Sequence, residues 1–266
     1  MNRTAFLHGI QLLLLLILLL LLANLWFSRN NEVWWQEPVQ LAIYPINADG
    51  DAVTQAWIDQ LRVEHFREIE RFFAREAKRY RLPLEQPIRV QLAPQVDSTP
   101  PQVPEQPSIL DAIWWSAKMQ LWVWWHDPLP GDQVDARVFI NYHRPHSGMD
   151  MRHSLGLQRG LIGLVNGYAG VDDLGRNNLI AAHEFLHTLG ASDKYDAETT
   201  EPLWPDGYAD PTRMPLYPQT RAEIMAGRVQ VSPGWVLLPP SLDHAVIGAA
   251  TAIEINWLAA TPEQQP

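Results

Sequence analysis

Apolar residues recur along most of the chain with the spacing of strands and helices, but the first apolar segment has no such spacing. Residues 10–27 are almost wholly apolar and contain an unbroken Leu/Ile run from Leu12 to Leu22. A stretch of about 18 apolar residues is just long enough to cross a bilayer as a helix. It ends without the small-residue pattern of a signal-peptide cleavage site. We therefore favour an uncleaved transmembrane anchor over a cleaved signal peptide.

The flanks of this segment set its expected orientation. Residues 1–9 form a short tail with Arg3, and Arg29 follows the segment closely, so the charge asymmetry is small. A short tail favours a cytoplasmic N-terminus. We expect a single-pass membrane protein with an extracytoplasmic domain, which would be periplasmic if the source is bacterial.

The remaining pattern predicts an α+β fold with a mixed sheet. Residues 28–50 read as a linker that enters a first strand near Val39–Tyr44, and residues 51–266 as one domain. Helical spacing of apolar residues predicts one long amphipathic helix over residues 54–80. Further elements are expected as a strand at 88–92, a capped helix at 108–118, strands at 119–125 and 137–142, a strand or hairpin at 155–166 and a final helix at 242–258.

A helix is also predicted over residues 177–189. Its apolar stripe consists of Leu179, Ala182, Leu186 and Leu189. Asn177 or Asn178 can cap its start, and Asp172 and Asp173 lie on its N-terminal side, where negative charge is favourable.

Two histidines in this helix carry the strongest chemical signal of the chain. His183 and His187 are four positions apart and project from one face. Imidazole nitrogens at that spacing can bind one Zn²⁺, and Glu184 beside them can accept a proton from a water on the metal. Gly190 permits a left-handed turn at the helix end. Asp193 could then return as third ligand and leave a fourth position for water. The alternative is a buried helix with two incidental histidines.

The stretch His183–Asp193, HEFLHTLGASD, resembles the extended HExxHxxGxxH motif of metzincin metallopeptidases. It is closer to the variant with aspartate in the third place, as in the snapalysin-like peptidases. The resemblance covers roughly residues 177–227. It implies a zincin-like catalytic domain with one catalytic zinc ion, in which His183, His187 and Asp193 hold the metal and Glu184 is the general base.

Residues 223–227 resemble the methionine turn that lies beneath the metal in metzincins, with Met225 as its methionine. Some metzincins place a tyrosine two residues after this methionine, as an extra ligand or transition-state donor. That position is Gly227 here, so the role is empty or is filled by Tyr195 or Tyr217.

Three weaker candidates compete for metal ions. Glu223 would be the third ligand if the site were gluzincin-like, but it lies in irregular chain, so Asp193 is preferred. A histidine group in the loop after residue 142 could form a second site, although solvated loop histidines are more common; its members are His143, His146 and His153. The acidic stretch at 193–210 could hold a structural Ca²⁺, and we favour a solvated loop.

The composition of the chain excludes several classes of function and site. The net charge is −10 and the pI about 5.3, which argues against nucleic acid as a partner. The chain has no cysteine, so disulfides, thiolate zinc sites and a cysteine switch are excluded. Five of its 12 tryptophans lie in residues 108–125; they could bind a carbohydrate or a membrane surface, and we favour a core role with partial exposure.

These features together predict a membrane-anchored zinc metallopeptidase that acts on a protein or peptide substrate. Two alternatives remain: a zinc hydrolase of a non-peptide amide, and a catalytically silent membrane-tethered binding module. An intact Glu184 argues against the silent module, because metal binding alone does not need it. The sequence determines neither the substrate nor the oligomeric state.

Overall fold

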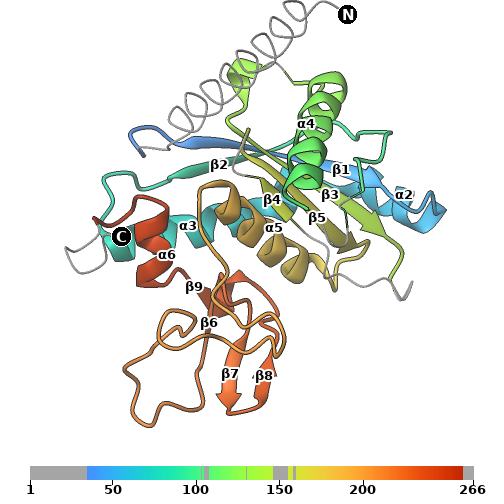
Figure 1. The fold of residues 1–266 in the computed structure, drawn as a ribbon. Coiled ribbons are helices and arrows are strands. Elements are labelled where there is room, and N and C mark those ends of the chain that lie inside the picture. Colours follow the sequence, from blue (N-terminus) through green and yellow to red (C-terminus); the bar gives the residue numbers. More distant parts are fainter. Residues whose placement is uncertain are drawn as a thin grey trace, which may run out of the picture. The chain divides into compact units, whose positions relative to one another are not determined.

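A computed structural model describes residues 35–102, 104, 108–129, 131–145, 155–157 and 160–259. Val33–Pro266 form one compact unit. Its centre is a five-stranded sheet with the strand order β2-β1-β3-β5-β4 (Figure 1). The strands are β1 (Val39–Asn47), β2 (Ile88–Leu92), β3 (Ala136–His143), β4 (Leu155–Leu157) and β5 (Ile162–Tyr168). All neighbours are parallel except β4, which pairs antiparallel with β5. The α+β fold with a mixed sheet is confirmed, as is the hairpin alternative for residues 155–166.

Alternating residues of β1, an inner strand of the sheet, pack into two separate cores. Leu41 and Ile43 belong to one cluster, whereas Ala42 and Tyr44 belong to the other. Successive side chains of a strand point to opposite faces, so both faces of the sheet are covered. Such a strand is apolar throughout, which is why β1 reads as a continuous apolar run.

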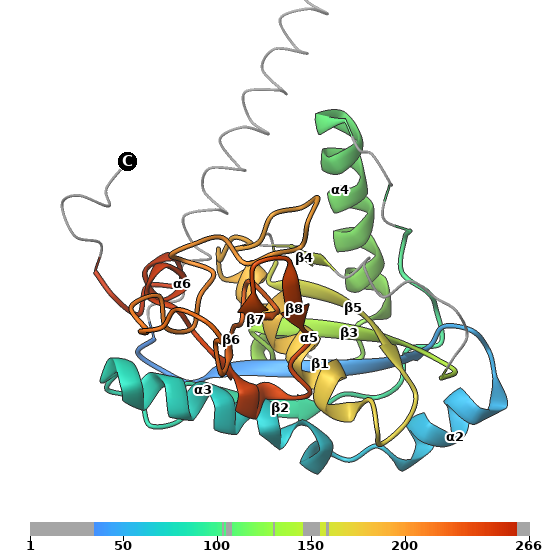
Figure 2. The ribbon, with the colours of Figure 1, turned by 90° about the horizontal axis from the view of Figure 1, so that it is seen from below.

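The first face is covered by α2 (Ala52–Gln60), α3 (Arg67–Tyr80) and α5 (Leu174–Thr188) (Figure 2). The single helix expected over 54–80 is wrong, because the chain breaks after α2. Leu61 has an extended ψ of 140° and is buried, and a 3₁₀ turn, Val63–Phe66, follows. At the break, the Arg62 backbone N–H donates to His65 Nδ1. The break changes the direction of the chain, so that α2 and α3 can each bury an apolar side in the same core. A single straight helix could not change direction in this way.

The second face is covered by α4 (Ile109–His126), so the strand expected at 119–125 is wrong. Ser108 caps this helix, as expected, and Asp111 also completes a capping box that was not predicted. Trp115, Met119 and Val123 recur every four residues and face the sheet. Other large apolar residues of α4 are exposed. The helix therefore has apolar residues on both sides, and this pattern resembled that of a strand.

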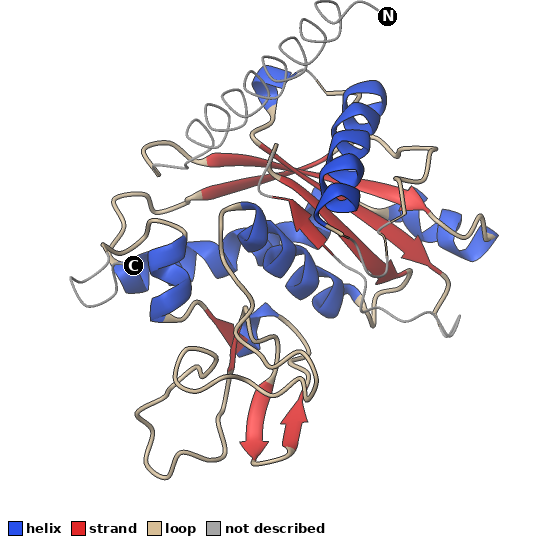
Figure 3. Ribbon diagram, in the orientation of Figure 1, coloured by secondary structure: helices blue, strands red, loops and turns tan. Residues whose placement is uncertain are grey.

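The segment after α5 forms small sheets and one short helix (Figure 3). Strand β6 (Ala222–Glu223) pairs with β9 (Ala245–Val246), and β7 (Val229–Ser232) pairs with β8 (Trp235–Leu237). A 3₁₀ turn, Leu242–His244, precedes β9, and helix α6 covers only Ala249–Glu254. The final helix expected over 242–258 is therefore wrong, because its first third is used for a turn and for pairing with β6.

The fold class also needs correction on the membrane helix. The expected anchor, residues 10–27, lies outside the described residues. Among the helices that the structure describes, none is both long and apolar enough to cross a bilayer. Even α4, with 18 residues, carries Asp111 and Lys118 along its length. The described part of the chain is thus an α+β domain, and its zincin-like assignment stays a prediction.

Candidate metal centre

Helix α5 begins earlier than its sequence indicated. Its N-cap is Asp173, whose side chain makes no capping bond, and the expected caps Asn177 and Asn178 are buried inside the helix. Asn177 Nδ2 donates to the Tyr168 carbonyl at 2.8 Å, and Asn178 Nδ2 donates to the His65 carbonyl at 2.8 Å. The two amides therefore connect α5 to β5 and to the 3₁₀ turn that precedes α3.

The two faces of α5 are those expected. Leu179, Ala182 and Leu186 are buried in the first core. His183 and His187 project away from it, with ring centroids 4.6 Å apart. Their side chains are only 14% and 19% exposed, so both imidazoles are largely withdrawn from water.

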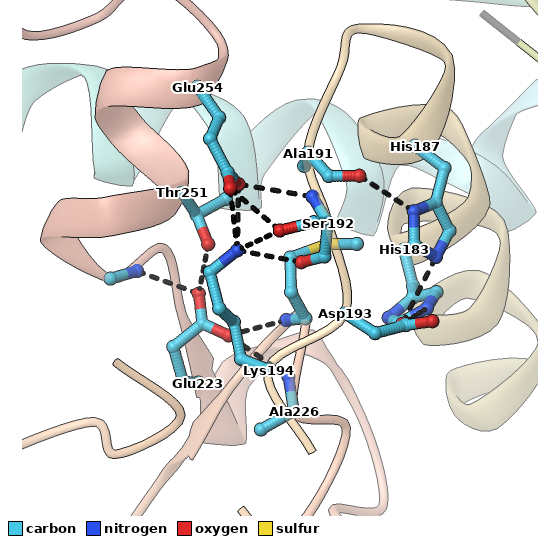
Figure 4. A network of polar contacts seen from close by, with 12 residues as sticks. His183, His187, Ala191, Ser192, Asp193, Lys194, Glu223, Ala226, Thr251 and Glu254 are labelled. Atoms are coloured by element: carbon cyan, nitrogen blue, oxygen red, sulfur yellow. Dashed lines mark hydrogen bonds and ion pairs between the residues drawn. The ribbon is translucent and has the colours of Figure 1, made fainter. Parts of the chain in front are cut away.

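The turn after α5 brings Asp193 back to the histidines. Gly190 has φ +104°, the left-handed conformation that favours glycine, as predicted. Asp193 Oδ1 lies 3.3 Å from His183 Nε2 and 3.2 Å from His187 Nε2 (Figure 4). Of all groups of three or more His, Asp or Glu side chains in the described ranges, only these three residues are placed to hold a metal ion.

The donor set fits zinc. His183 Nδ1 lies 2.9 Å from the Ile224 carbonyl, and His187 Nδ1 lies 2.8 Å from the Ala191 carbonyl. A carbonyl accepts from a protonated Nδ1, which leaves the Nε2 lone pair of each ring for the centre. Two imidazoles and one carboxylate with a free fourth position are typical of catalytic zinc. The three residues therefore fit the ion that the motif implies.

Electrostatics favour a cation at this place. Burial lowers the pKa of His183, but the Asp193 hydrogen bond, the charge of Glu184 and the Ile224 carbonyl outweigh burial and raise it to about 9. Burial acts to raise the pKa of Asp193, but its bonds to both histidines hold that pKa below its usual range. Without a metal, His183 therefore keeps its proton near pH 7 and lies beside the carboxylate of Asp193.

Glu184 is buried beside the group, at 5% exposure. Its Oε2 atom has no hydrogen-bond partner among the described residues. Burial raises its pKa above the ordinary value, while the positive charge of the two histidines opposes the rise. A buried carboxylate oxygen without a partner costs free energy, and a raised pKa suits a general base.

Residues 223–227, which the resemblance assigns to a methionine turn, lie next to His183. Met225 is fully buried, and the carbonyl of its neighbour Ile224 orients His183. Glu223 is fully buried as well, but it faces away. Its Oε2 accepts from the Met225 and Ala226 N–H groups, and its Oε1 accepts from the Gly248 N–H and the Thr251 hydroxyl. Both oxygens are used, so the gluzincin-like alternative does not fit the geometry.

One of the two candidate tyrosines lies at the site. Burial raises the pKa of Tyr195, and the nearby charges of Asp193 and Glu184 raise it further. Tyr217 instead pairs through its hydroxyl with Tyr208 at 3.2 Å. Tyr195 is therefore the residue that could fill the role left empty at Gly227.

The weaker candidates are not brought together as metal sites among the described residues. His143 is buried in β3, and His146 and His153 lie outside the described part of the chain. In the acidic stretch, Asp196 and Asp210 instead accept from nearby backbone N–H groups and threonine hydroxyls.

Sequence reasoning missed the residues that hold Asp193 in place. Lys194 is almost fully buried and pairs with Glu254 of α6 at 2.8 Å. A lysine in such a loop would normally be solvated. No sequence signal links two charges that are 60 positions apart.

Comparisons with known proteins add no family. No family model matches the chain, and no curated protein does. Two solved structures are similar in part: one described as a chaperone–substrate complex (TM-score 0.40, 12% identity, 82% of this chain and 33% of that chain) and OgpA from Akkermansia muciniphila (TM-score 0.35, 12% identity, 86% and 63%). The chain spans about a third of the first and less than two thirds of the second. These similarities are too weak to indicate a function, so a functional proposal has to rest on the geometry of the site.

Proposed function

We propose that this chain is a zinc-dependent metallopeptidase. The observation that carries the proposal is the convergence of His183 Nε2, His187 Nε2 and Asp193 Oδ1 beside a buried carboxylate, Glu184, one oxygen of which has no hydrogen-bond partner in the described part of the chain. The first three atoms would hold a zinc ion and leave room for a water ligand. The fourth residue supplies the proton acceptor that hydrolysis requires.

When bound, zinc lowers the pKa of a coordinated water towards about 7 and polarises a carbonyl oxygen. Glu184 Oε2 accepts the proton of the attacking water and delivers it to the leaving nitrogen of the peptide. The Ile224 and Ala191 carbonyls hold the two imidazoles in the orientation and tautomer that ligation needs. Tyr195, whose pKa is raised by burial and by the nearby charges of Asp193 and Glu184, is the candidate donor to the oxygen that becomes negative in the transition state.

The edge strand β4 favours an extended peptide as substrate. It is one of the two edge strands of the five-stranded sheet and packs on α5. A Cβ at Gly156 would overlap the Glu184 carbonyl oxygen and His187 Cβ. An exposed strand edge pairs readily with an extended peptide through backbone hydrogen bonds. A peptide bound along β4 would therefore lie beside the two histidines.

The test combines metal analysis with activity on the purified full chain. We expect about one zinc ion per chain and cleavage of an unstructured protein substrate, with both lost after chelation and restored by zinc. Glu184→Gln should keep its zinc and lose about 10²–10⁴-fold in rate, the usual effect of removing a general base. Glu64→Gln, in an exposed carboxylate of the 3₁₀ turn, is the control and should cleave normally.

Each result separates the proposal from an alternative. Zinc binding with no cleavage of any peptide would favour the silent binding module. Zinc-dependent cleavage of acylated amines but not of peptides would favour the non-peptide amide hydrolase. Full activity of Glu184→Gln would remove this residue from the mechanism.

A further inference from the structure

The residues on either side of Asp193 point away from the histidines and toward helix α6 (Figure 4). Asp193 is the one proposed ligand that is not part of α5, and its side chain is 43% exposed. Its position therefore depends on how the chain around it is held. Ser192 and Lys194 are the residues that hold it.

Ser192 and Lys194, the two neighbours of Asp193, both donate hydrogen bonds to one carboxylate, that of Glu254. Glu254 of α6 accepts from the Ser192 N–H at 3.1 Å and from the Ser192 hydroxyl at 2.7 Å. Lys194 Nζ donates to Glu254 Oε1 and Oε2 at 2.9 and 2.8 Å. The same ammonium donates to the Ser192 carbonyl and hydroxyl at 2.8 and 2.7 Å. The bonds form a closed network around the peptide units next to Asp193.

The network also joins the ligand loop to the methionine turn. The Lys194 N–H donates to the Met225 carbonyl at 3.0 Å. Helix α6 is itself tied to that turn, because Glu223 accepts from Thr251 Oγ1 at 2.8 Å and from the Gly248 N–H at 2.9 Å. The ligand loop, the turn beneath the histidines and α6 are thus linked by charged and buried groups.

We propose that Lys194 and Glu254 are positioning residues that set the affinity of the site for its metal by holding Asp193 over the two histidines. This inference rests on the proposed zinc site. Groups that orient a ligand through hydrogen bonds typically change metal affinity about 10–100-fold when removed. The Lys194 side chain is 7% exposed, so Glu254 also compensates a charge that would be costly to bury alone.

The test uses the full chain with Glu254→Gln, which keeps the shape of the side chain but removes its charge. Ser192→Ala is a milder second variant that removes one hydroxyl from the same network. The matched control is Glu76→Gln. Glu76 is likewise a carboxylate with a cation partner, Arg79 at 2.6 Å, although it is more deeply buried than Glu254, and it accepts from the Ile247 N–H just before α6. It makes no contact with the ligand loop in the described structure.

Two quantities are measured for each variant: the zinc dissociation constant by chelator competition, and amide hydrogen exchange of residues 191–195 in the metal-free protein. For Glu254→Gln we expect zinc affinity to fall about 10–100-fold. We also expect exchange in the loop to rise about tenfold, as for the loss of a charge-assisted hydrogen bond. Ser192→Ala should give smaller changes of the same sign. Glu76→Gln should lower the melting temperature but leave both quantities unchanged.

The outcomes are distinguishable. Unchanged loop exchange in Glu254→Gln would overturn the inference whatever the metal does. Faster exchange with unchanged zinc affinity would show that the network stabilises the loop without positioning the ligand, and would also overturn it. If the unmutated chain binds no zinc, the proposed function fails and the positioning role fails with it, while the exchange data still show whether Glu254 holds the loop.

Discussion

The two faces of the central sheet are both rich in apolar residues, yet they differ in what lies beyond the first buried layer. On the face covered by α5, the far side of the helix carries partly buried histidines whose ring nitrogens meet specific partners. On the face covered by α4, the far side carries exposed apolar residues, among them Trp114, Trp124 and Trp125 at 64%, 72% and 73% exposure. Both helices are therefore held on the sheet by an apolar inner stripe. They differ on the outer side, which carries hydrogen-bonded histidines in α5 and exposed tryptophans in α4.

The largest effect is expected inside the α4 face. Trp115→Ala removes a large side chain that is 6% exposed and packs on the sheet, and should cost about 3–5 kcal/mol of unfolding free energy. Trp124→Ala, at 72% exposure, should change it by about 0.5 kcal/mol or less. Denaturant unfolding measures both. Equal losses would mean that the outer tryptophan is also covered.

The second prediction compares the zinc affinity after removal of each of the two carboxylates near α5, Asp193 and Glu223. Asp193→Ala should weaken zinc binding more than the ~10–100-fold expected for an outer partner, because it removes a ligand. Glu223→Ala should leave a zinc affinity much closer to that of the unmutated chain, since its oxygens face backbone N–H groups, although it should destabilise the fold. A competing chelator measures both constants. Zinc loss only in Glu223→Ala would reverse the assignment.

A smaller effect is expected where β4 meets α5. Gly156→Ala places a methyl group against the Glu184 carbonyl and His187 Cβ, so strand and helix must separate. Overpacking of this kind costs about 1–3 kcal/mol, and peptide cleavage should fall with it. Gly131→Ala, where an added Cβ meets nothing within 4 Å, is the matched control for thermal unfolding and activity. Similar behaviour of the two variants would contradict the close packing.

The smallest effect is the pH dependence of zinc binding. In the metal-free chain the pKa of His183 is raised to about 9, so near pH 7 zinc must displace its proton. Affinity should rise about tenfold per pH unit below that pKa and level off above it. Chelator competition at three pH values gives the slope. A flat profile would show that His183 is neutral before the metal binds.

Part of the site could be predicted because it depends on one helix and one turn. The spacing of His183 and His187 places both rings on one face of any α-helix. Gly190 adopts the left-handed conformation that the sequence indicated, so Asp193 returns to them. These relations span few residues and need no knowledge of the rest of the chain.

Other predictions failed because local patterns are ambiguous. The apolar run at 119–125 fits a strand or a two-sided helix, and only packing on the sheet decides between them. Asn177 and Asn178 are good caps by residue type, but their amides instead pair with Tyr168 and His65. The long helix over 54–80 is divided because both of its parts must reach the same core.

Periodicity and short spacing were thus enough to predict the α+β class, the strands of the five-stranded sheet and the pairing of His183 with His187 on one helix face. The choice between Asp193 and Glu223, the choice between Tyr195 and Tyr217, and the pairing of Lys194 with Glu254 became visible in the folded chain. These contacts join segments distant along the chain, and their free energy depends on burial. Burial exists only once the chain has folded.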